Sequence, residues 1–194
     1  MRLSLTNKRS TRPEILDHNI VHEYHYDLVL GTLEEIRRHV YARATRDTLP
    51  SWDFAASRQG WHYGGATDQG WPITGELRVQ HERADAWLTS PSIAVRTEQA
   101  PLLVIDAAFQ TSDAKAQVFW STLEHSGFAE ARSMTFPIQG DGEYREYRVR
   151  LADSPEYRGL LLQLQLHPSN EAGAKVHVRS VRLERESGPS AGAK

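Results

Sequence analysis

The chain has no cysteine among its 194 residues, and no apolar run comes near the length of a membrane-spanning helix. A disulfide framework and a thiolate metal site are therefore both excluded. A transmembrane helix needs about 20 largely apolar residues, so the sequence predicts no membrane partner. Lysine and arginine number 23 against 25 for aspartate and glutamate. This balance lacks the basic excess that is typical of nucleic-acid-binding proteins, and we expect no nucleic-acid partner.

The common catalytic motifs are also missing. The sequence contains no GxSxG, HExxH, P-loop or Rossmann dinucleotide-binding pattern. Glycoside hydrolysis needs two carboxyl groups facing each other across a cleft, and nothing singles out a pair among Asp106, Glu130 and Glu146. The pattern therefore favours a protein without catalytic activity.

The start of the chain, "MRLSLTNKRSTRPEI", has basic residues but no apolar segment of the kind found in a signal peptide. The sequence thus leaves the localisation open. We expect an extracellular or cell-surface location only if this domain forms part of a longer exported chain.

Composition divides the chain into four parts. Thr32 and Glu35 have the spacing of a capping box, which predicts the beginning of a helix, and a proline at position 50 ends the helical pattern. This helical part is either native to the domain or the tail of an upstream domain with its linker. The predicted parts are a flexible basic start at 1–12, a helical segment and linker at 13–50, a β-sandwich domain at 51–186, and a flexible tail at 187–194.

After position 50, short β-rich runs alternate with clusters of glycine, proline, aspartate and serine. Regular alternation of this kind is typical of an all-β sandwich. We therefore predict two antiparallel sheets in a jelly-roll arrangement, preceded by the helical segment. Strands are expected near 52–55, 75–81, 92–96, 102–109, 115–121, 133–138, 144–151, 160–167 and 175–183.

Three of these predicted strands alternate polar and apolar side chains, so each has one wet face. Matching their phases places five side chains on one predicted surface: Gln117, Phe119, Arg148, Gln163 and Gln165. Amide and guanidinium groups carry fixed patterns of donors and acceptors that can match sugar hydroxyls, and a phenyl ring can stack on the C–H face of a pyranose. The alternative is that this face is only solvated, as one face of an antiparallel sheet commonly is.

Aromatic residues suggest a second part of the same site. Trp61, Tyr63 and Trp71 lie in the glycine-rich stretch "RQGWHYGGATDQGWPITG", and loops on a sandwich usually display binding groups. With the nearby His62 and Asp68 they are predicted to form a sugar-binding platform, with the alternative that the indoles merely plug the end of the sandwich. The other three tryptophans are expected to be packing residues: Trp52, Trp87 and Trp120.

A structural calcium ion is a further possibility. Asp53 lies near the start of the predicted sandwich and Glu184 near its end, and first and last strands often pair. Calcium binds six to eight oxygen atoms, many of them backbone carbonyls, so its sites leave little trace in a sequence. The alternative is an ordinary pair of surface carboxylates.

Several stretches resemble a known family: "WDFAASRQGW", "AQVFW", "FPIQGDGEYREYRVRL", "YRGLLLQLQLHP" and "VHVRSVRL". Over residues 51–186 they are similar to carbohydrate-binding modules of the galactose-binding jelly-roll type, which are attached to polysaccharide-degrading enzymes. The resemblance implies a non-catalytic accessory module that binds a polysaccharide or oligosaccharide beside a catalytic domain. It also implies a structural calcium near the chain ends, at Asp53 and Glu184. Gln165 and His167 depart from it, because relatives tend to read "LRLDP" where this chain reads "LQLHP".

Two other functions remain open. A structural or interaction sandwich that packs on a neighbouring enzyme domain would expose an apolar patch around Leu28, Leu33 and Ile36. A jelly-roll polysaccharide lyase or hydrolase would need a cleft containing a catalytic base and its partners.

Overall fold

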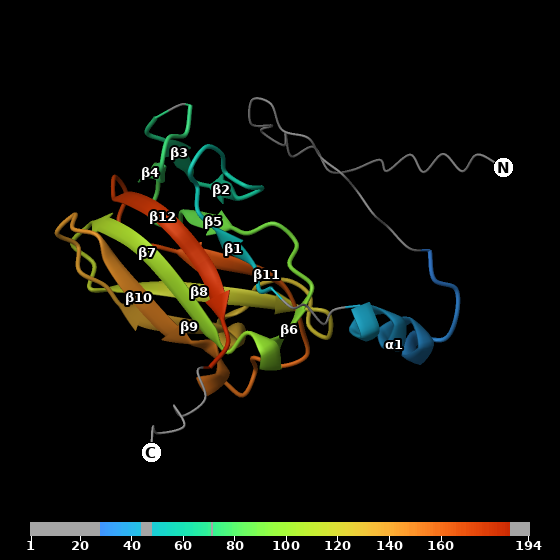
Figure 1. Ribbon diagram of the computed structural model, residues 1–194. Helices are drawn as coiled ribbons and strands as arrows, with labels where there is room; N and C mark the ends of the chain where they lie inside the picture. Colours follow the sequence, from blue (N-terminus) through green and yellow to red (C-terminus); the bar gives the residue numbers. More distant parts are fainter. Residues whose placement is uncertain (1–27, 44–47, 71, 187–194) are drawn as a thin grey trace, which may run out of the picture.

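The computed structural model describes residues 28–43, 48–70 and 72–186. Most of its regular structure is β-strand, arranged as two antiparallel sheets of six strands each. Figure 1 shows the two sheets as layers, with strands β10, β7 and β12 in front of β8 and β11. The predicted β-sandwich with a helix near the N-terminus is therefore confirmed. The predicted start at 1–12, much of the predicted helical segment (13–27 and 44–47), Trp71 and the tail at 187–194 lie outside the described residues.

The first sheet, sheet A, has the strand order β10-β7-β12-β4-β3, with β1 also pairing with β12. Its strands are β1 (Ser51–Trp52), β3 (Ala66–Asp68), β4 (Leu77–His81), β7 (Leu102–Gln110), β10 (Arg145–Arg150) and β12 (Lys175–Glu184).

The second sheet, sheet B, has the order β2-β5-β11-β8-β9, with β6 also pairing with β11. Its strands are β2 (His62–Gly64), β5 (Trp87–Thr89), β6 (Val95–Arg96), β8 (Lys115–Thr122), β9 (Ser133–Pro137) and β11 (Leu160–His167). Three short 3-10 turns lie between strands: η1 (Thr97–Gln99), η2 (Glu130–Arg132) and η3 (Leu151–Asp153).

Helix α1 (Leu33–Arg43) begins at the predicted capping box. The backbone N–H of Thr32 donates to Glu35 Oε2 at 2.8 Å, and the N–H of Glu35 donates to Thr32 Oγ1 at 3.3 Å. The hydroxyl of Tyr41 donates to the carboxylate of Glu124, and the guanidinium of Arg96 lies 5.1 Å from the centre of the Tyr41 ring. These contacts fasten the end of the helix to the sandwich. No helix in the described part of the chain is long and apolar enough to cross a membrane.

The core between the sheets is built from the inward side chains of both. Trp120 and Trp52 are buried there, as the sequence predicts. Trp61 is only 4 % exposed. Its ring meets Trp52 edge-on at 5.3 Å and Phe54 edge-on at 5.9 Å, both favourable aromatic geometries. Trp61 therefore belongs to the core.

Strand β11 contains an irregularity that the sequence does not reveal. Its pairing with β8 shifts register between Leu161 and Gln163. A bulge inserts one extra residue into a strand and so changes which side chains point inward. Leu161 consequently packs in the core with Leu164, while Leu162 is half-buried. The predicted alternation of inward and outward side chains is therefore wrong at Leu161 and Leu162, and it holds from Gln163 to His167.

Candidate functional site

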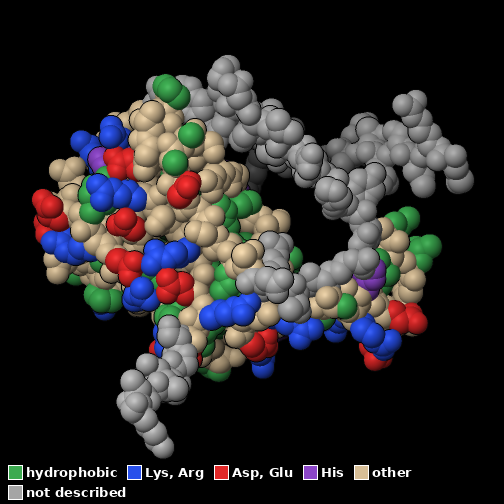
Figure 2. All heavy atoms as spheres, viewed as in Figure 1, with side chains coloured by type: hydrophobic (Ala, Val, Ile, Leu, Met, Phe, Trp, Pro, Cys, Tyr) green, Lys and Arg blue, Asp and Glu red, His purple; other side chains and the backbone are tan. Residues whose placement is uncertain are grey.

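The outer face of sheet A carries a closed ring of ion pairs. Arg148 donates to Glu146 at 2.8 Å and to Glu184 at 2.9 Å. Arg182 donates to the same two carboxylates at 2.6 and 2.7 Å. Both arginines lie opposite Val104 in the strand register, and Val104 is fully buried beneath the ring. Figure 2 shows acidic and basic side chains interleaved over this face.

The ring explains why β10 alternates charged and apolar residues. Hydrogen bonds from Arg182, and then from Arg148, lower the pKa of Glu146 and of Glu184. The predicted grouping of Arg148 with the glutamines is wrong, because β10 pairs with β7 in sheet A. Alternation shows that a strand has a wet face but does not show which sheet the strand joins.

The two carboxylates expected to share a calcium ion are not brought together. Trp52 lies opposite Val181, so Glu184 is level with Leu49, four residues from Asp53. At about 3.3 Å per residue this separation is about 13 Å along the strand. The Asp53 carboxylate instead accepts hydrogen bonds from its own loop, where Gln59 Nε2 lies at 2.6 Å.

These residues therefore do not fit a shared calcium ion. Within residues 28–43, 48–70 and 72–186, no group of three or more histidine, aspartate or glutamate side chains is arranged to hold a metal ion. The structural calcium stays a prediction without an identified set of ligands.

The outer face of sheet B differs in kind from that of sheet A. Its strand register aligns one row of side chains across all five strands of the main path: His62, Thr89, Gln165, Phe119 and Ser133. Parallel rows on the same face hold Gly64 with Trp87, Gln163 with Ser121, and His167 with Gln117 and Thr135. We call these residues the polar face of sheet B. None of these residues carries a carboxylate, an ammonium or a guanidinium group, but the exposed Lys115, opposite Pro137, lies on the same side of β8 beyond Gln117.

The polar face brings together Gln117, Phe119, Gln163 and Gln165, as the sequence predicts, but they are not equally available. Gln117 donates from Nε2 to Glu130 Oε2 at 2.9 Å and to Ser133 Oγ at 2.8 Å. Phe119 is only 7 % exposed. Gln163 and Gln165 line a hollow described below, so they are the stronger candidates for contact with a ligand.

Hydrogen bonds hold these two amides in place. Gln165 Nε2 donates to Thr89 Oγ1 at 3.0 Å, and Gln165 Oε1 lies 2.9 Å from His167 Nε2. Because an amide oxygen only accepts, the His167 nitrogen is the donor. Gln163 Nε2 donates to the carbonyl of Ser90 at 3.3 Å. Each primary amide has two N–H groups, so both glutamines retain capacity for a ligand.

His167, the third member of this hydrogen-bond network, has a lowered pKa. Burial lowers its pKa, and the carboxylates of Glu130 and Asp85 oppose that effect only in part. The imidazole is therefore neutral at pH about 7, which lies above its ordinary pKa of about 6.5. The polar face is consequently uncharged at this position as well.

A hollow of about 340 Å³ opens on the polar face. Trp87 is half-buried, and the ring of His62 stands edge-on to it with centroids 5.6 Å apart. Aromatic surface beside convergent polar groups is the usual make-up of a small-molecule site. The hollow is lined by His62, Trp87, Thr89, Phe128, Gln163 and Gln165.

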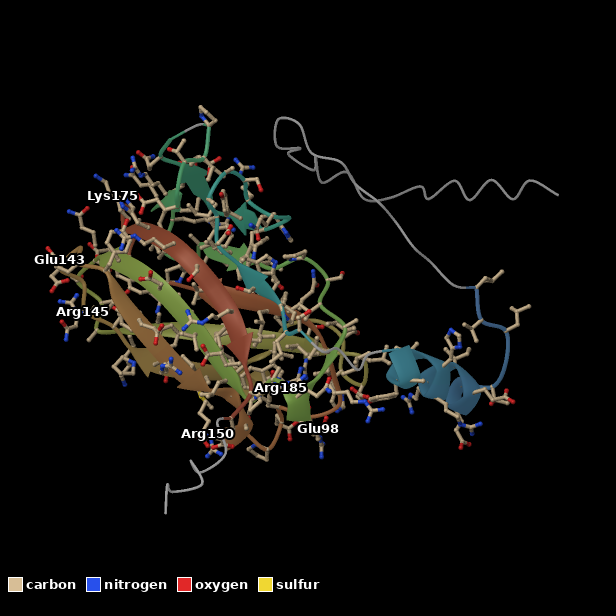
Figure 3. The ribbon with its side chains drawn as sticks, in the orientation of Figure 1. Glu98, Glu143, Arg145, Arg150, Lys175 and Arg185 are labelled. Atoms are coloured by element: carbon tan, nitrogen blue, oxygen red, sulfur yellow. The ribbon has the colours of Figure 1, made fainter. Side chains whose placement is uncertain are left out.

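A larger hollow, of about 640 Å³, lies at one end of the sandwich. Figure 3 shows Glu98, Arg150 and Arg185 at this end. Its lining mixes charges of both signs, and Glu186 accepts from Arg150 at 2.7 Å. We favour the smaller hollow as the candidate site, because there an indole and a phenyl ring meet two amide groups on a sheet face.

Of the predicted platform residues that the structure describes, only His62 lines this hollow. Alternate residues of a strand point to opposite sides, so His62 and Gly64 face outward on β2 while Tyr63 packs against the core. The Tyr63 hydroxyl donates to Asp68 Oδ1 at 2.8 Å. Trp61 is buried in the core, so it has no open ring face for stacking. Trp71 lies outside the described residues.

Three residues of the hollow were not predicted as binding residues: Trp87, Thr89 and Phe128. Trp87 was expected to pack, yet it lines the hollow. The alternation of Trp87 and Thr89 about the buried Leu88 was the available signal. Phe128 lies in the loop between β8 and β9, and nothing in its local sequence marks it, because only the tertiary fold brings it to the hollow.

No family model matches the chain, and no curated protein matches it. Among solved structures, the chain is similar to a low-affinity xylan-binding module of family 86 from Roseburia intestinalis. That match has 14 % identity and a TM-score of 0.47, and it covers 72 % of this chain and 98 % of the other. A variant of a family 29 carbohydrate-binding module, complexed with mannohexaose, matches at 13 % identity and a TM-score of 0.48, covering 71 % and 94 %.

A third similar structure is the second N-terminal cellulose-binding domain of a Cellulomonas fimi β-1,4-glucanase. It matches at 19 % identity and a TM-score of 0.45, covering 72 % of this chain and 94 % of the other. At these identities and TM-scores the likenesses do not bear on function, which we take from the side chains of sheet B.

Proposed function

We propose that this protein is a non-catalytic carbohydrate-binding module, and that the polar face of sheet B binds the glycan. One observation carries the proposal: a hollow on the polar face, lined by no lysine, arginine, aspartate or glutamate, in which an indole lies beside two oriented amides. Sugar hydroxyls exchange hydrogen bonds with amide, hydroxyl and imidazole groups. The negative face of an aromatic ring attracts the C–H groups of a pyranose.

The charge distribution favours a neutral glycan. No ionisable side chain other than His62 lines the hollow. Two carboxylates lie outside the hollow on this side of the molecule. Glu130 accepts a hydrogen bond from Gln117 at 2.9 Å, and the charges of Glu130 and Asp85 both raise the pKa of His167 against the larger effect of its burial. Asp85 is itself paired with Arg83 at 2.7 Å, and no lysine or arginine lines the hollow to pair with a uronate or sulfate group. We therefore expect binding of neutral polysaccharides and exclusion of acidic ones.

The sequence resemblance over residues 51–186 suggests the setting. In it, the module would be an accessory of a glycan-degrading system, outside the cell or at its surface, and would work beside a catalytic domain that cleaves the same polymer. The residues that line the hollow offer hydrogen bonds and ring surface, so we propose binding and no reaction.

The test is affinity electrophoresis against soluble xylan, glucomannan and cellulose derivatives, with polygalacturonate as the acidic polymer. We expect retardation by at least one neutral polymer. Trp87→Ala should weaken the binding about tenfold or more, which corresponds to about 1.4 kcal/mol or more, because it removes the ring surface. Gln163→Ala should weaken it less.

The matched control is Gln139→Ala, an exposed glutamine away from the hollow, which should leave retardation unchanged. Retardation by polygalacturonate alone, or by none of the polymers, would contradict the proposal.

A second function is favoured by one specific observation. Leu28, Leu30 and Leu33 are 80 %, 87 % and 63 % exposed at the beginning of the chain's described part, while Ile36 is half-buried. Contiguous exposed leucines mark a surface for apolar contact. In this alternative the domain packs through these leucines on a neighbouring enzyme domain. Sedimentation velocity should then show concentration-dependent self-association that Leu30→Gln abolishes. A single monomeric species at every concentration would argue against it.

A further inference from the structure

Gly64 faces Trp87 directly across the β2–β5 pair, on the polar face of sheet B. A Cβ atom built on Gly64 would lie 2.3 Å from Cε2 and Cζ2 of Trp87 and 2.7 Å from Nε1. Ordinary contacts between carbon atoms are about 3.5–4.0 Å. The indole therefore occupies the space that any other residue at position 64 would need for its side chain.

The backbone at position 64 does not itself demand glycine. Gly65, the next residue, has a φ of +67°, a conformation that favours glycine, whereas the φ of Gly64 is not positive. Alanine could therefore adopt the backbone of Gly64 without strain. The requirement at this position comes from the indole alone.

Two neighbours thus fix the orientation of Trp87. The glycine leaves room for the indole to lie across β2, and His62 stands edge-on to it at an interplanar angle of 89°. Trp87 remains half-buried in this position and contributes one wall of the hollow, together with Gln163 and Gln165.

We propose that Gly64 is a positioning residue for ligand binding. By leaving its side-chain space empty, it lets the Trp87 indole lie flat on the sheet and present a fixed surface to a sugar ring. This inference rests on the proposed function of the polar face. An aromatic residue across from a glycine on an edge strand can also serve stability alone, so the experiment has to separate the two roles.

The first arm of the experiment is a cycle of Gly64→Ala, Trp87→Ala and the double variant, measured by affinity electrophoresis and by thermal melting. We expect Gly64→Ala to weaken glycan binding about tenfold, or about 1.4 kcal/mol, because the added methyl group displaces the indole. In the Trp87→Ala background the same alanine should weaken binding no further.

An equal loss in both backgrounds would mean that the alanine acts through the backbone, and it would overturn the proposal. Binding by Gly64→Ala at the wild-type affinity would overturn it as well.

The second arm needs no glycan, so it separates this inference from the proposed function. The near-ultraviolet circular dichroism of Trp87 is obtained as wild type minus Trp87→Ala, and its accessibility from acrylamide quenching in the same pair. Gly64→Ala should change both signals. Gln139→Ala is the control, since this exposed side chain lies away from Trp87 and its loss should leave both signals unchanged.

If no glycan binds the wild type, the proposed function fails, while a changed Trp87 signal still supports the placement of the indole by Gly64. Unchanged Trp87 signals in Gly64→Ala would overturn the positioning role whatever the glycan result.

Discussion

At the scale of single residues, His81 shows how burial links protonation to stability. It lies on β4 with only 2 % of its surface exposed, pointing inward with Leu77 and Val79. Burial lowers its pKa, and the backbone of Glu171 and the carboxylate of Asp113 offset this only in part. The folded protein therefore holds this ring neutral, whereas the unfolded chain takes up a proton at its ordinary pKa of about 6.5.

A group whose pKa is lowered on folding binds more protons in the unfolded state, so stability falls as the pH drops below the unfolded pKa. We predict that the urea midpoint decreases between about pH 7 and about pH 5.5, a range just around the ordinary histidine pKa of about 6.5. His81→Leu should reduce this decrease. Part of it should remain, because burial lowers the pKa of His167 in the same direction. An equal decrease in His81→Leu would show that His81 is not responsible.

At the scale of strands, length decides what the sequence can predict. The long strands β7, β8, β10, β11 and β12 were predicted within about one residue at each end, as boundary uncertainty allows, because several alternating residues define the period. Strands β2, β3 and β5 have three residues each and were missed, since so short a run shows no period. They form because neighbours in the sheet supply their hydrogen-bond partners.

Strand length also decides which residues of the candidate site could be predicted. Gln163, Gln165 and Gln117 were placed on one face because they lie on long alternating strands that pair directly. Trp87 and Thr89 were missed as binding residues because they lie on a strand of only three residues. Arg148 was assigned to the wrong sheet because β10 and β11 alternate alike, and only long-range pairing distinguishes them.

Strand β10 also provides a prediction. Arg148→Ala opens the ion-pair ring on the outer face of sheet A, but the side chain is half exposed, so solvent and salt already weaken its interactions. We expect a small loss of stability that shrinks further at high salt, measured by urea unfolding at two ionic strengths. Glycan affinity should not change. A loss of glycan binding in this variant would place the site on sheet A instead.

At the scale of the whole molecule, the two outer faces of the sandwich have different chemistry. Sheet A satisfies its charges within its own face, through arginine–glutamate pairs that cross from strand to strand. Sheet B shows amides, hydroxyls and aromatic rings around a hollow. The lining of this hollow contains no lysine, arginine, aspartate or glutamate, and it is this uncharged, hydrogen-bonding surface that suits a neutral sugar.

The most direct test of this account is an amide-resolved NMR titration of the whole chain with neutral hexasaccharides of xylose, glucose and mannose. We predict that one of them shifts the amide signals of β2, β5 and β11 and the indole N–H of Trp87, while those of β10, β7 and β12 stay in place. Shifts confined to sheet A would contradict the account. So would the absence of any shift with all three sugars at millimolar concentration, which corresponds to a binding free energy weaker than about 4 kcal/mol.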